Sequence, residues 1–431
     1  MKEPLVLDQT FRDILDQLEH QHEHFFVTGK AGTGKSTLLQ LFRKTTAKKV
    51  VVLSPTGISA LNVQGQTIHS FFQFPPKLMH PGEVFVQRRL SRIMRALEAI
   101  IIDEISMVRA DVMDAIDFAL RLYRKSELPF GGIQMIFFGD LFQLPPVVSS
   151  REEKEYFRSF YASPYFFHAH VFEGKVPLLM IEMTKVFRQS ERHFIRLLDA
   201  IRTLSFEYEE LEEINQRYLP DHEIEEPFLT LCSTNAAANQ INKERLEQLD
   251  STSYFYHGEI KGNFNPSVFP TDYKLELRLH GQVMMIRNDP EKRFVNGSLG
   301  KIIALEDDKI VVRLTSETGQ SEEFEIPKMT WEVTKYTMTS DSANPIQSEV
   351  IGSFTQYPVK LAWAITIHKS QGKTYDRVAI DLGRGAFEHG QTYVALSRCR
   401  TLHGVFLKRL LSPRDIMVDE RIVEFYDTMR M

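Results

Sequence analysis

The sequence predicts an α/β fold made of two parallel-sheet units, with a small antiparallel β-barrel inserted in the second. Three observations predict it: apolar runs alternate with helical stretches in the first third, a new apolar run starts after Pro227, and short alternating runs follow from Leu275 to Trp331. Continuous apolar runs are typical of buried parallel strands, whereas alternation is typical of antiparallel strands with one solvated face. The βαβα order predicts doubly wound units, whose ligands bind at the carboxyl ends of the strands.

Each unit is predicted from its own runs. The strands expected in the first unit are His24–Thr28, Lys49–Leu53, Ala99–Ile102 and Gln134–Phe138. We expect this unit to span residues 1–190, with a small protrusion at about 63–80. The second unit is expected at 191–265 and 350–431, and the inserted barrel at 266–349.

Composition excludes several classes of protein. Of the 431 residues, 43% are hydrophobic and 25% charged, which is typical of a globular protein and not of a fibre or a disordered chain. Cys232 and Cys399 supply neither a disulfide framework nor a four-thiolate zinc site. No apolar run approaches the roughly 18 residues of a membrane span, and no signal segment is evident, so we expect a cytoplasmic protein without a membrane partner.

The net charge of −5 bears on nucleic-acid binding. A protein that held DNA through overall electrostatic attraction would be much more basic. Any binding of nucleic acid is therefore expected to use a local channel.

Gly29 to Ser36 forms a phosphate-binding motif. The segment GKAGTGKS matches G-x-x-x-x-G-K-[ST] and lies between an expected strand and an expected helix. Glycines let the backbone fold around phosphates, the helix N-terminus faces negative charge, Lys35 reaches the outer phosphates and Ser36 can ligate Mg²⁺. The nucleotide-binding residues expected here are Gly29, Ala31, Gly32, Thr33, Gly34, Lys35, Ser36 and Thr37.

Two further segments are expected at the same edge of the sheet. The run AIIIDE ends in Asp103, which would hold Mg²⁺ with Ser36, and in Glu104, which is placed to accept a proton from the attacking water. The segment FGDLFQLPPV follows another expected strand and carries Asp140 and Gln143. Gln143 could bond the γ-phosphate or the water, although a turn stiffened by prolines is an alternative interpretation.

The order of these and later motifs resembles a known family. In chain order the motifs are GKAGTGKS, PTGISALNVQGQTIHSFF, IIDEISM, FFGDLFQLPPV, VFRQ, ITIHKSQGKT and YVALSR. This series resembles that of the superfamily-one helicases, and specifically the Pif (petite integration frequency) DNA helicases. The resemblance covers about Gln9 to Arg400, and the segment after Met107 resembles the stretch that separates Pif helicases from RecD-like and phage relatives. It implies two RecA-like lobes with ATP between them, moving 5′ to 3′ along single-stranded DNA.

The resemblance also implies individual roles. Gln9 would read the adenine, while Gly372 and Lys373 would lie on the second lobe's side of the nucleotide. Arg188 and Arg398 would reach the γ-phosphate, because planar, permanently charged guanidinium groups suit phosphoryl oxygens. The expected catalytic set is Lys35, Asp103, Glu104, Gln143, Arg188 and Arg398.

A track for single-stranded DNA is implied on both lobes. Binding without sequence choice uses hydroxyl and amide groups for phosphates and flat side chains for bases. The candidates are Pro55, Thr56, Gly57, His69, Ser70 and Phe72 on the first lobe, and Thr234, Asn235, His368, Lys369 and Ser370 on the second.

Two neighbouring segments have open interpretations. Phe71–Lys77 would split the duplex at the fork or pack on the lobe as a hydrophobic patch. Val84–Leu97 contains four arginines and no acid, and these either face DNA phosphates or form an exposed helix face. The four are Arg88, Arg89, Arg92 and Arg95.

The whole pattern predicts a helicase that uses ATP and Mg²⁺ and binds single-stranded, forked or otherwise structured DNA as a monomer in solution. Forks, G-quadruplexes and RNA–DNA hybrids stay open as the preferred structure, and the short ends resemble bacterial members of the family. The alternatives are a RecD-like or phage-type helicase, a nucleotide switch, which needs Lys35 and Asp103 but not Arg398, and a non-catalytic DNA-binding protein, which needs no Asp103–Glu104 pair.

Overall fold

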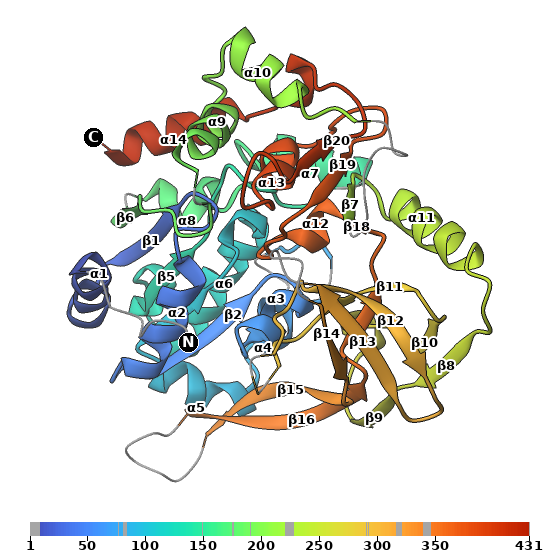
Figure 1. The fold of residues 1–431 in the computed structure, drawn as a ribbon. Coiled ribbons are helices and arrows are strands. Elements are labelled where there is room, and N and C mark those ends of the chain that lie inside the picture. The colour runs from blue at the N-terminus through green and yellow to red at the C-terminus, as the bar shows by residue number, and fades with distance from the viewer. Residues whose placement is uncertain are drawn as a thin grey trace.

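The predicted fold class is confirmed in a computed structural model, and the first unit is built on a six-stranded parallel sheet (Figure 1). The structure describes residues 9–75, 77–80, 84–148, 150–174, 176–189, 191–219, 228–289, 291, 293–315, 321–338 and 346–430. The strand order is β3-β2-β4-β5-β1-β6. In chain order the strands are β1 (His24–Gly29), β2 (Val50–Ser54), β3 (Gln66–Thr67), β4 (Ala99–Ile102), β5 (Gln134–Phe138) and β6 (Leu178–Met183).

The four strands predicted from apolar runs occupy the middle of this sheet. They are buried almost throughout, which is why their sequences are continuously apolar. Alternate residues of β1 serve opposite faces, because Phe26 joins one core cluster while Phe25 and Val27 join another. The sequence pattern misses β3, which has two residues, and β6, which lies half-exposed at the sheet edge.

Helices cover both faces of the first sheet. They are α1 (Gln9–His20), α2 (Lys35–Thr45), α3 (Gly57–Asn62), α4 (Ile68–Phe72), α5 (Arg88–Ala96), α6 (Ala110–Arg124), α7 (Arg151–Phe160) and α8 (His170–Glu173). Among the residues that the structure describes, no helix is long and apolar enough to cross a lipid bilayer.

The last helix, α14 (Glu420–Arg430), returns to the first sheet, although its residues fall in the range predicted for the second unit. Tyr426 packs against Phe26, with ring centroids 6.1 Å apart, and its hydroxyl shares a hydrogen bond of 2.6 Å with Thr28 Oγ1. The chain thus crosses to the second unit and comes back.

The second unit contains a four-stranded parallel sheet in the order β18-β7-β19-β20. Its strands are β7 (Leu229–Cys232), β18 (Ala364–Thr366), β19 (Val378–Asp381) and β20 (Val405–Leu407). Its helices are α9 (Arg192–Thr203), α10 (Tyr208–Asn215), α11 (Asn235–Glu247), α12 (Ile367–Ser370) and α13 (Gln391–Leu396). A separate hydrophobic core joins α9 and α13 to this sheet.

The inserted unit consists of antiparallel sheets of five, three and two strands. Its strands are β8 (Tyr254–His257), β9 (Glu259–Gly262), β10 (Lys274–Leu277), β11 (Gln282–Met285), β12 (Leu299–Leu305), β13 (Ile310–Thr315), β14 (Ser321–Glu325), β15 (Met329–Met338), β16 (Ile346–Gln356) and β17 (Val359–Leu361). The alternating runs of the sequence correspond to β10 through β14. Pairing also includes β8, β9 and β17, which lie outside the range predicted for the barrel.

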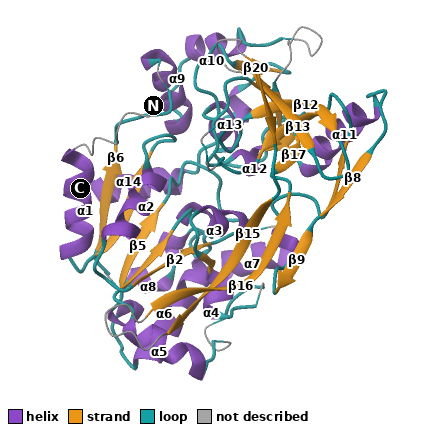
Figure 2. Ribbon diagram, turned by 60° about the horizontal axis from the view of Figure 1, so that its bottom comes forward, coloured by secondary structure: helices purple, strands orange, loops and turns teal. Residues whose placement is uncertain are grey.

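The β15–β16 pair extends from the inserted unit back to the first unit (Figures 1 and 2). Tyr336 and Ile346 are buried in the core cluster of the first unit. The Tyr336 hydroxyl accepts a hydrogen bond of 3.0 Å from the Val52 amide, and its ring meets Phe71 edge-on at 5.9 Å. The inserted unit is therefore held against the first unit as well as joined to the second.

Candidate active site and nucleic-acid interface

The phosphate-binding loop lies between β1 and α2, as predicted. Gly32 has a φ of 83°, and a Cβ there would lie 2.4 Å from Arg188 Cβ, so only glycine fits this close approach. Lys35 Nζ donates to the carbonyl oxygens of Gly29, at 2.6 Å, and Lys30, at 3.0 Å. Burial lowers the pKa of Lys35 to about 8, against the opposing charges of Asp140 and Glu104. The ammonium group thus lies within the loop, with two carboxylates in electrostatic range.

Asp103 and Glu104 follow directly after β4, beside the loop. Burial, and then the charge of Glu104, raise the pKa of Asp103 to about 7. Burial also raises the pKa of Glu104, while the charges of Lys35 and Arg398 oppose that rise. Glu104 adopts a left-handed backbone with a φ of 52°, a conformation that costs a side-chain-bearing residue about 1 to 2 kcal/mol. Such strain is often found at functional sites.

The charges of Arg188 and Arg398 both lower the pKa of Glu104, although the two arginines come from different segments. Arg398 follows α13 of the second unit, and its side chain donates to Val394 O at 2.8 Å and to Ser397 Oγ at 2.8 Å. Arg188 lies in the connection after β6 and donates to Ser397 O at 3.4 Å. Burial and the charge of Arg398 lower the pKa of Arg188 to about 9. The structure therefore brings Lys35, Glu104, Arg188 and Arg398 together across the seam between the units.

Gln143 also reaches this cluster, through a glutamine that the sequence analysis did not single out. Gln371 Nε2 lies 3.3 Å from Glu104 Oε2 and 3.2 Å from Gln143 Oε1. Gln143 in turn donates to Asp140 Oδ2 at 3.2 Å. Gln371 belongs to the ITIHKSQGKT motif, so its place in a recognised motif was the available signal. The second unit thus contacts both Glu104 and Gln143.

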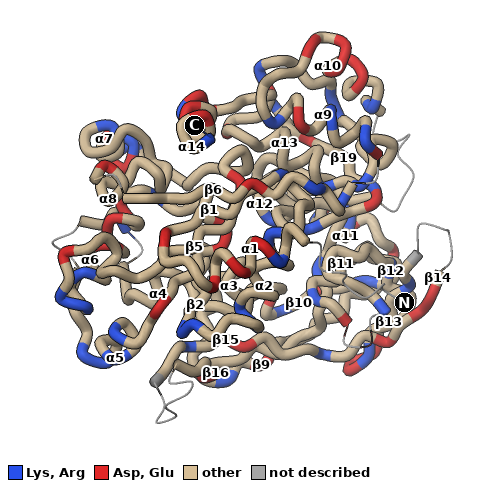
Figure 3. Tube along the Cα trace, turned by 90° about the vertical axis from the view of Figure 1, so that its left-hand side faces the viewer, with Lys and Arg blue, Asp and Glu red and all other residues tan. Residues whose placement is uncertain are grey.

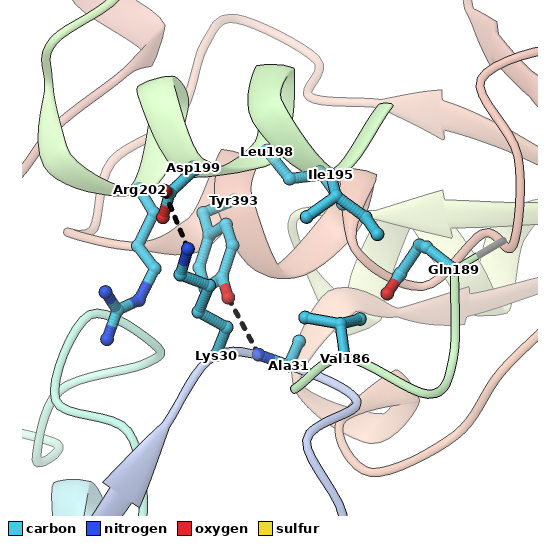
Figure 4. Close-up of a pocket in the computed structure, with 9 residues that line it drawn as sticks. All are labelled: Lys30, Ala31, Val186, Gln189, Ile195, Leu198, Asp199, Arg202 and Tyr393. Atoms are coloured by element: carbon cyan, nitrogen blue, oxygen red, sulfur yellow. Dashed lines mark hydrogen bonds and ion pairs between the residues drawn. The ribbon is translucent and has the colours of Figure 1, made fainter. Parts of the chain in front are cut away.

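A buried polar network behind the loop was also missed, and Figure 4 shows its Ala31, Tyr393 and Arg202. The Tyr393 hydroxyl of α13 accepts a hydrogen bond of 2.9 Å from the Ala31 amide and lies 3.5 Å from Asp140 Oδ2. Asp140 forms a buried ion pair of 2.9 Å with Arg202 of α9. Tyr393 belongs to YVALSR and Asp140 to FGDLFQLPPV, whereas no motif marked Arg202. The network ties the phosphate-binding loop to two helices of the second unit.

A second ion pair lies across the same seam. Lys30 Nζ contacts Asp199 Oδ2 of α9 at 2.7 Å, and the two side chains line a small cavity with Tyr393 (Figure 4). Lys30 and Ala31 are neighbours in the loop. The second unit therefore contacts two consecutive residues of the loop.

The remaining nucleotide-site candidates lie at the rim of the cluster. Gln9 begins α1 and donates to Asp13 at 2.7 Å. Two residues later, the Phe11 ring lies against Gly34 and meets the exposed Phe187 ring edge-on at 6.3 Å. Thr33 is buried, and Ser36 and Thr37 are exposed on the first turn of α2. These positions place α1 next to the loop.

On the second unit, Gly372 has a φ of 76°, and the space where a Cβ would point is open. Burial and the charge of Lys360 lower the pKa of Lys373 to about 8. Arg398 donates to the Lys373 carbonyl at 3.3 Å, which links this segment to the arginine.

Helices that begin within three residues of a strand end recur in the predicted strand track of both units. In each case a threonine hydroxyl caps the helix by accepting a hydrogen bond from the backbone N–H three residues later. The capping threonines are Thr56, Thr67, Thr234 and Thr366. A hydroxyl that accepts from the backbone still has a proton to donate to a phosphate. Thr67 and Thr366 were not among the predicted residues.

Three predicted strand contacts are covered by protein in this structure. Phe72 is 3% exposed and stacks on Phe74 at 5.1 Å within the core, so its ring offers no face to a base. Gly57 lies under Val268 of the inserted unit, whose Cγ1 is 2.2 Å from where a Cβ of residue 57 would be. Ser370 is fully buried and donates to Ile367 O at 2.6 Å.

The other track candidates are accessible in part. Asn235 is exposed, Pro55, His69 and His368 are half-buried, and His368 forms an ion pair of 3.1 Å with Glu388. Burial lowers the pKa of His69 and of Lys369. At neutral pH this favours a neutral His69 imidazole, which can donate or accept a hydrogen bond.

Here Arg398 of the second lobe completes a site that the phosphate-binding loop of the first lobe begins. This is the arrangement of a motor ATPase of the superfamily-one helicase class, because its chemistry then depends on how the lobes meet. Residues 6–209 match the family described as PIF1-like helicase. The chain is 31% identical to the ATP-dependent DNA helicase Pif1 of Bdellovibrio bacteriovorus, over 94% of this chain and 88% of that protein. The chain belongs to the PIF1-like helicase family.

Other relatives and solved structures agree with this assignment. Human ATP-dependent DNA helicase PIF1 is 30% identical over 95% of this chain, which spans 62% of the human protein. Bacteroides sp Pif1 in complex with ADP-AlF4 matches with a TM-score of 0.91 at 36% identity, covering 99% of this chain and 98% of that one. Bacteroides Pif1 bound to ssDNA matches with a TM-score of 0.70 at 37% identity, covering 99% and 97%. The units of this structure are thus arranged more like those of the ADP-AlF4 complex.

The Tyr393 contact leads to a first prediction. Tyr393→Phe removes the hydroxyl that accepts from Ala31, and leaving a buried amide without its partner costs about 1 to 3 kcal/mol. We expect kcat for ATP hydrolysis to fall about tenfold, because the loop is no longer fixed to α13. The control is Tyr375→Phe, whose hydroxyl donates to the Met284 sulfur at 3.6 Å. Steady-state hydrolysis and thermal unfolding are measured together, and a loss of stability with unchanged kcat would make Tyr393 purely structural.

Proposed function

We propose that this chain is an ATP-dependent DNA helicase that hydrolyses ATP between its two lobes and moves 5′ to 3′ along single-stranded DNA. The observation that carries the proposal is the convergence of Lys35 and Arg398, from different lobes, on Glu104. Relatives in Bdellovibrio bacteriovorus and human bear the name ATP-dependent DNA helicase, which supports the activity. The direction of movement rests on the resemblance to Pif helicases.

The cluster suits phosphoryl transfer. Lys35, Arg188 and Arg398 are cations that stabilise charge on the outer phosphates as the bond to the leaving group breaks. Glu104 accepts the proton of the attacking water, and its raised pKa favours that role because a more basic carboxylate holds a proton better. Gln143 and Gln371 orient the water by their amide groups. Closure of the lobes completes the set, so hydrolysis and lobe movement are coupled.

The residues present fit a nucleotide-bound Mg²⁺. Mg²⁺ usually takes one or two protein oxygens and completes its shell with phosphate oxygens and water. Asp103 and Ser36 would provide two oxygen ligands beside the phosphate-binding loop. Burial and the charge of Glu104 raise the pKa of Asp103 despite the opposing charge of Lys35, so a further cation beside Asp103 would be favourable. When bound there, Mg²⁺ would supply positive charge that offsets the charge of the outer phosphates. Lys35 would exchange its loop carbonyls for phosphate oxygens.

Single-stranded DNA is proposed to cross both lobes along the capped helices. Supporting this, a relative has been solved with ssDNA, and another structure shows Pif1 helicases at forked dsDNA. The first-lobe part of the track lies beneath Val268 and beside Tyr336 of the inserted unit. We propose that the inserted unit moves aside when the strand binds, and that the protein is a monomer in solution that takes forks and G-quadruplexes as structured substrates.

Hydrolysis with and without a single-stranded oligonucleotide tests the proposed activity. We expect strong stimulation by the strand in the native chain. Glu104→Gln keeps the shape but removes the proton acceptor, so the rate should fall by about 10²- to 10⁴-fold. Glu152→Gln, an exposed change on α7, is the control and should behave like the native chain. Equal rates with and without DNA would contradict a translocase.

Direction of movement is tested with tailed duplexes. A duplex with a 5′ single-stranded tail should be unwound, because the motor loads on the tail and moves toward the junction, whereas one with only a 3′ tail should stay intact. Strand separation is followed by fluorescence of a quenched label. Preference for the 3′ tail would refute the proposed direction.

The docked β15–β16 pair is tested by Tyr336→Ala. This change removes the bond to the Val52 amide and the contact with Phe71, so the inserted unit is released more often. Affinity for single-stranded DNA should rise, on the order of tenfold, since less free energy is needed to expose the track. Tyr273→Ala, an exposed tyrosine of the same unit, is the control. Unchanged or weaker binding would contradict the proposal, and a gain cannot come from misfolding.

A further inference from the structure

The helix α5 carries a strongly basic face that neither the catalytic cluster nor the strand track uses. Arg88, Arg89, Arg92 and Arg95 are all exposed, while Leu90 and Ile93 turn toward the core. Figure 3 shows basic residues along α5 at the edge of the molecule. This local charge contrasts with the net charge of −5 of the whole chain.

Three of these arginines have no counter-charge among the residues that the structure describes. The side chains of Arg88, Arg92 and Arg95 form neither a hydrogen bond nor an ion pair there, although the Arg95 carbonyl accepts a hydrogen bond of 3.1 Å from Arg124. Surface helices usually interleave acids four residues from bases, as α7 does with Arg151 and Glu155 at 3.0 Å. Like charges at that spacing destabilise a helix. Repulsion among these unpaired arginines therefore raises the free energy of the isolated protein. An anionic partner would relieve that repulsion.

The spacing of these side chains suits a phosphate backbone. At 3.6 residues per turn, Arg88, Arg92 and Arg95 fall within about 60° of arc on the helix. They extend along about 10 Å of its axis, at 1.5 Å per residue. A DNA strand carries one phosphate about every 3.4 Å of duplex axis, so this length spans roughly three phosphates. The guanidinium fork binds phosphate oxygens in pairs.

The fourth arginine ties the face to the predicted strand track. Arg89 donates to Gln73 Oε1 at 2.5 Å and to Gln87 Oε1 at 3.0 Å. Gln73 is the C-cap residue that follows α4, and its side chain donates in turn to the Ser70 carbonyl. Ser70 belongs to the segment predicted to contact the single strand, so the arginine face continues directly from that segment. A duplex that meets the track at its junction would lie next to α5.

We infer that the exposed face of α5 binds the phosphates of the duplex arm of a DNA fork, without regard to sequence. The inference rests on the proposed helicase function and adds a site for the duplex ahead of the strands being separated. Its chemistry is that of backbone contacts, which position a duplex and depend strongly on salt.

The test compares a fork with its single-stranded tail alone. The variant is Arg88→Gln with Arg92→Gln and Arg95→Gln, which leaves Arg89 and its bonds intact. The matched control is Arg151→Gln with Lys154→Gln and Arg158→Gln on α7, which removes the same charge from exposed residues of the same unit. Binding is measured by fluorescence anisotropy between about 50 and about 200 mM salt.

We expect the α5 variant to bind the fork about 10- to 100-fold more weakly and the logarithmic salt dependence of fork affinity to decrease by roughly 3. Affinity for the single strand should match the parent chain, and the α7 control should match it on both DNAs. The single change Arg92→Gln should decrease the salt dependence by about 1.

Two outcomes would overturn the inference. Fork affinity equal to that of the α7 control would show that α5 does not touch the duplex. An equal loss on fork and single strand would place these arginines on the single-strand track instead. Failure of the parent chain to bind single strands would count against the proposed function itself, and is seen before any variant is made.

Discussion

The structure depends on charged groups that are placed inside the seam between two lobes. Lys35, Glu104 and Arg398 would each be costly to bury alone, because an ion taken out of water loses its hydration. Here carboxylates of the first lobe and a guanidinium of the second compensate one another. Glu104 thus faces cations from both lobes.

Around this cluster, the seam is held by directional polar contacts in addition to apolar packing, in which Ala31 and Leu144 join the core of the second unit. The Tyr393 bond to the Ala31 amide and the ion pair between Arg202 and Asp140 each need a particular geometry. Arg202 also lies over the Phe142 ring at 4.2 Å, a distance at which the ring attracts the cation. Contacts of this kind break cleanly when the lobes shift, whereas a large apolar interface would resist movement. A motor needs the first behaviour.

The inserted unit forms a second physical connection between the lobes. It belongs to the second unit in sequence, but Tyr336 and Ile346 share the core of the first. Its Val268 covers Gly57 at the start of a capped helix. The TM-scores of 0.91 against the ADP-AlF4 complex and 0.70 against the ssDNA complex of a relative show that this family has more than one arrangement of its units. In the proposed function, the docked β15–β16 pair covers surface that the DNA strand would use.

The sequence by itself determined the central parallel strands, the phosphate-binding loop and the positions of Lys35 and Glu104. These follow from short-range rules: a strand buried on both faces must be apolar throughout, and a loop around phosphates needs glycines followed by a helix. The tertiary structure alone decided that Arg202 would meet Asp140, that Phe72 would be buried and that α14 would return to the first sheet. Such contacts join residues far apart in the chain, and no local period or spacing encodes them, because they depend on how the completed units dock.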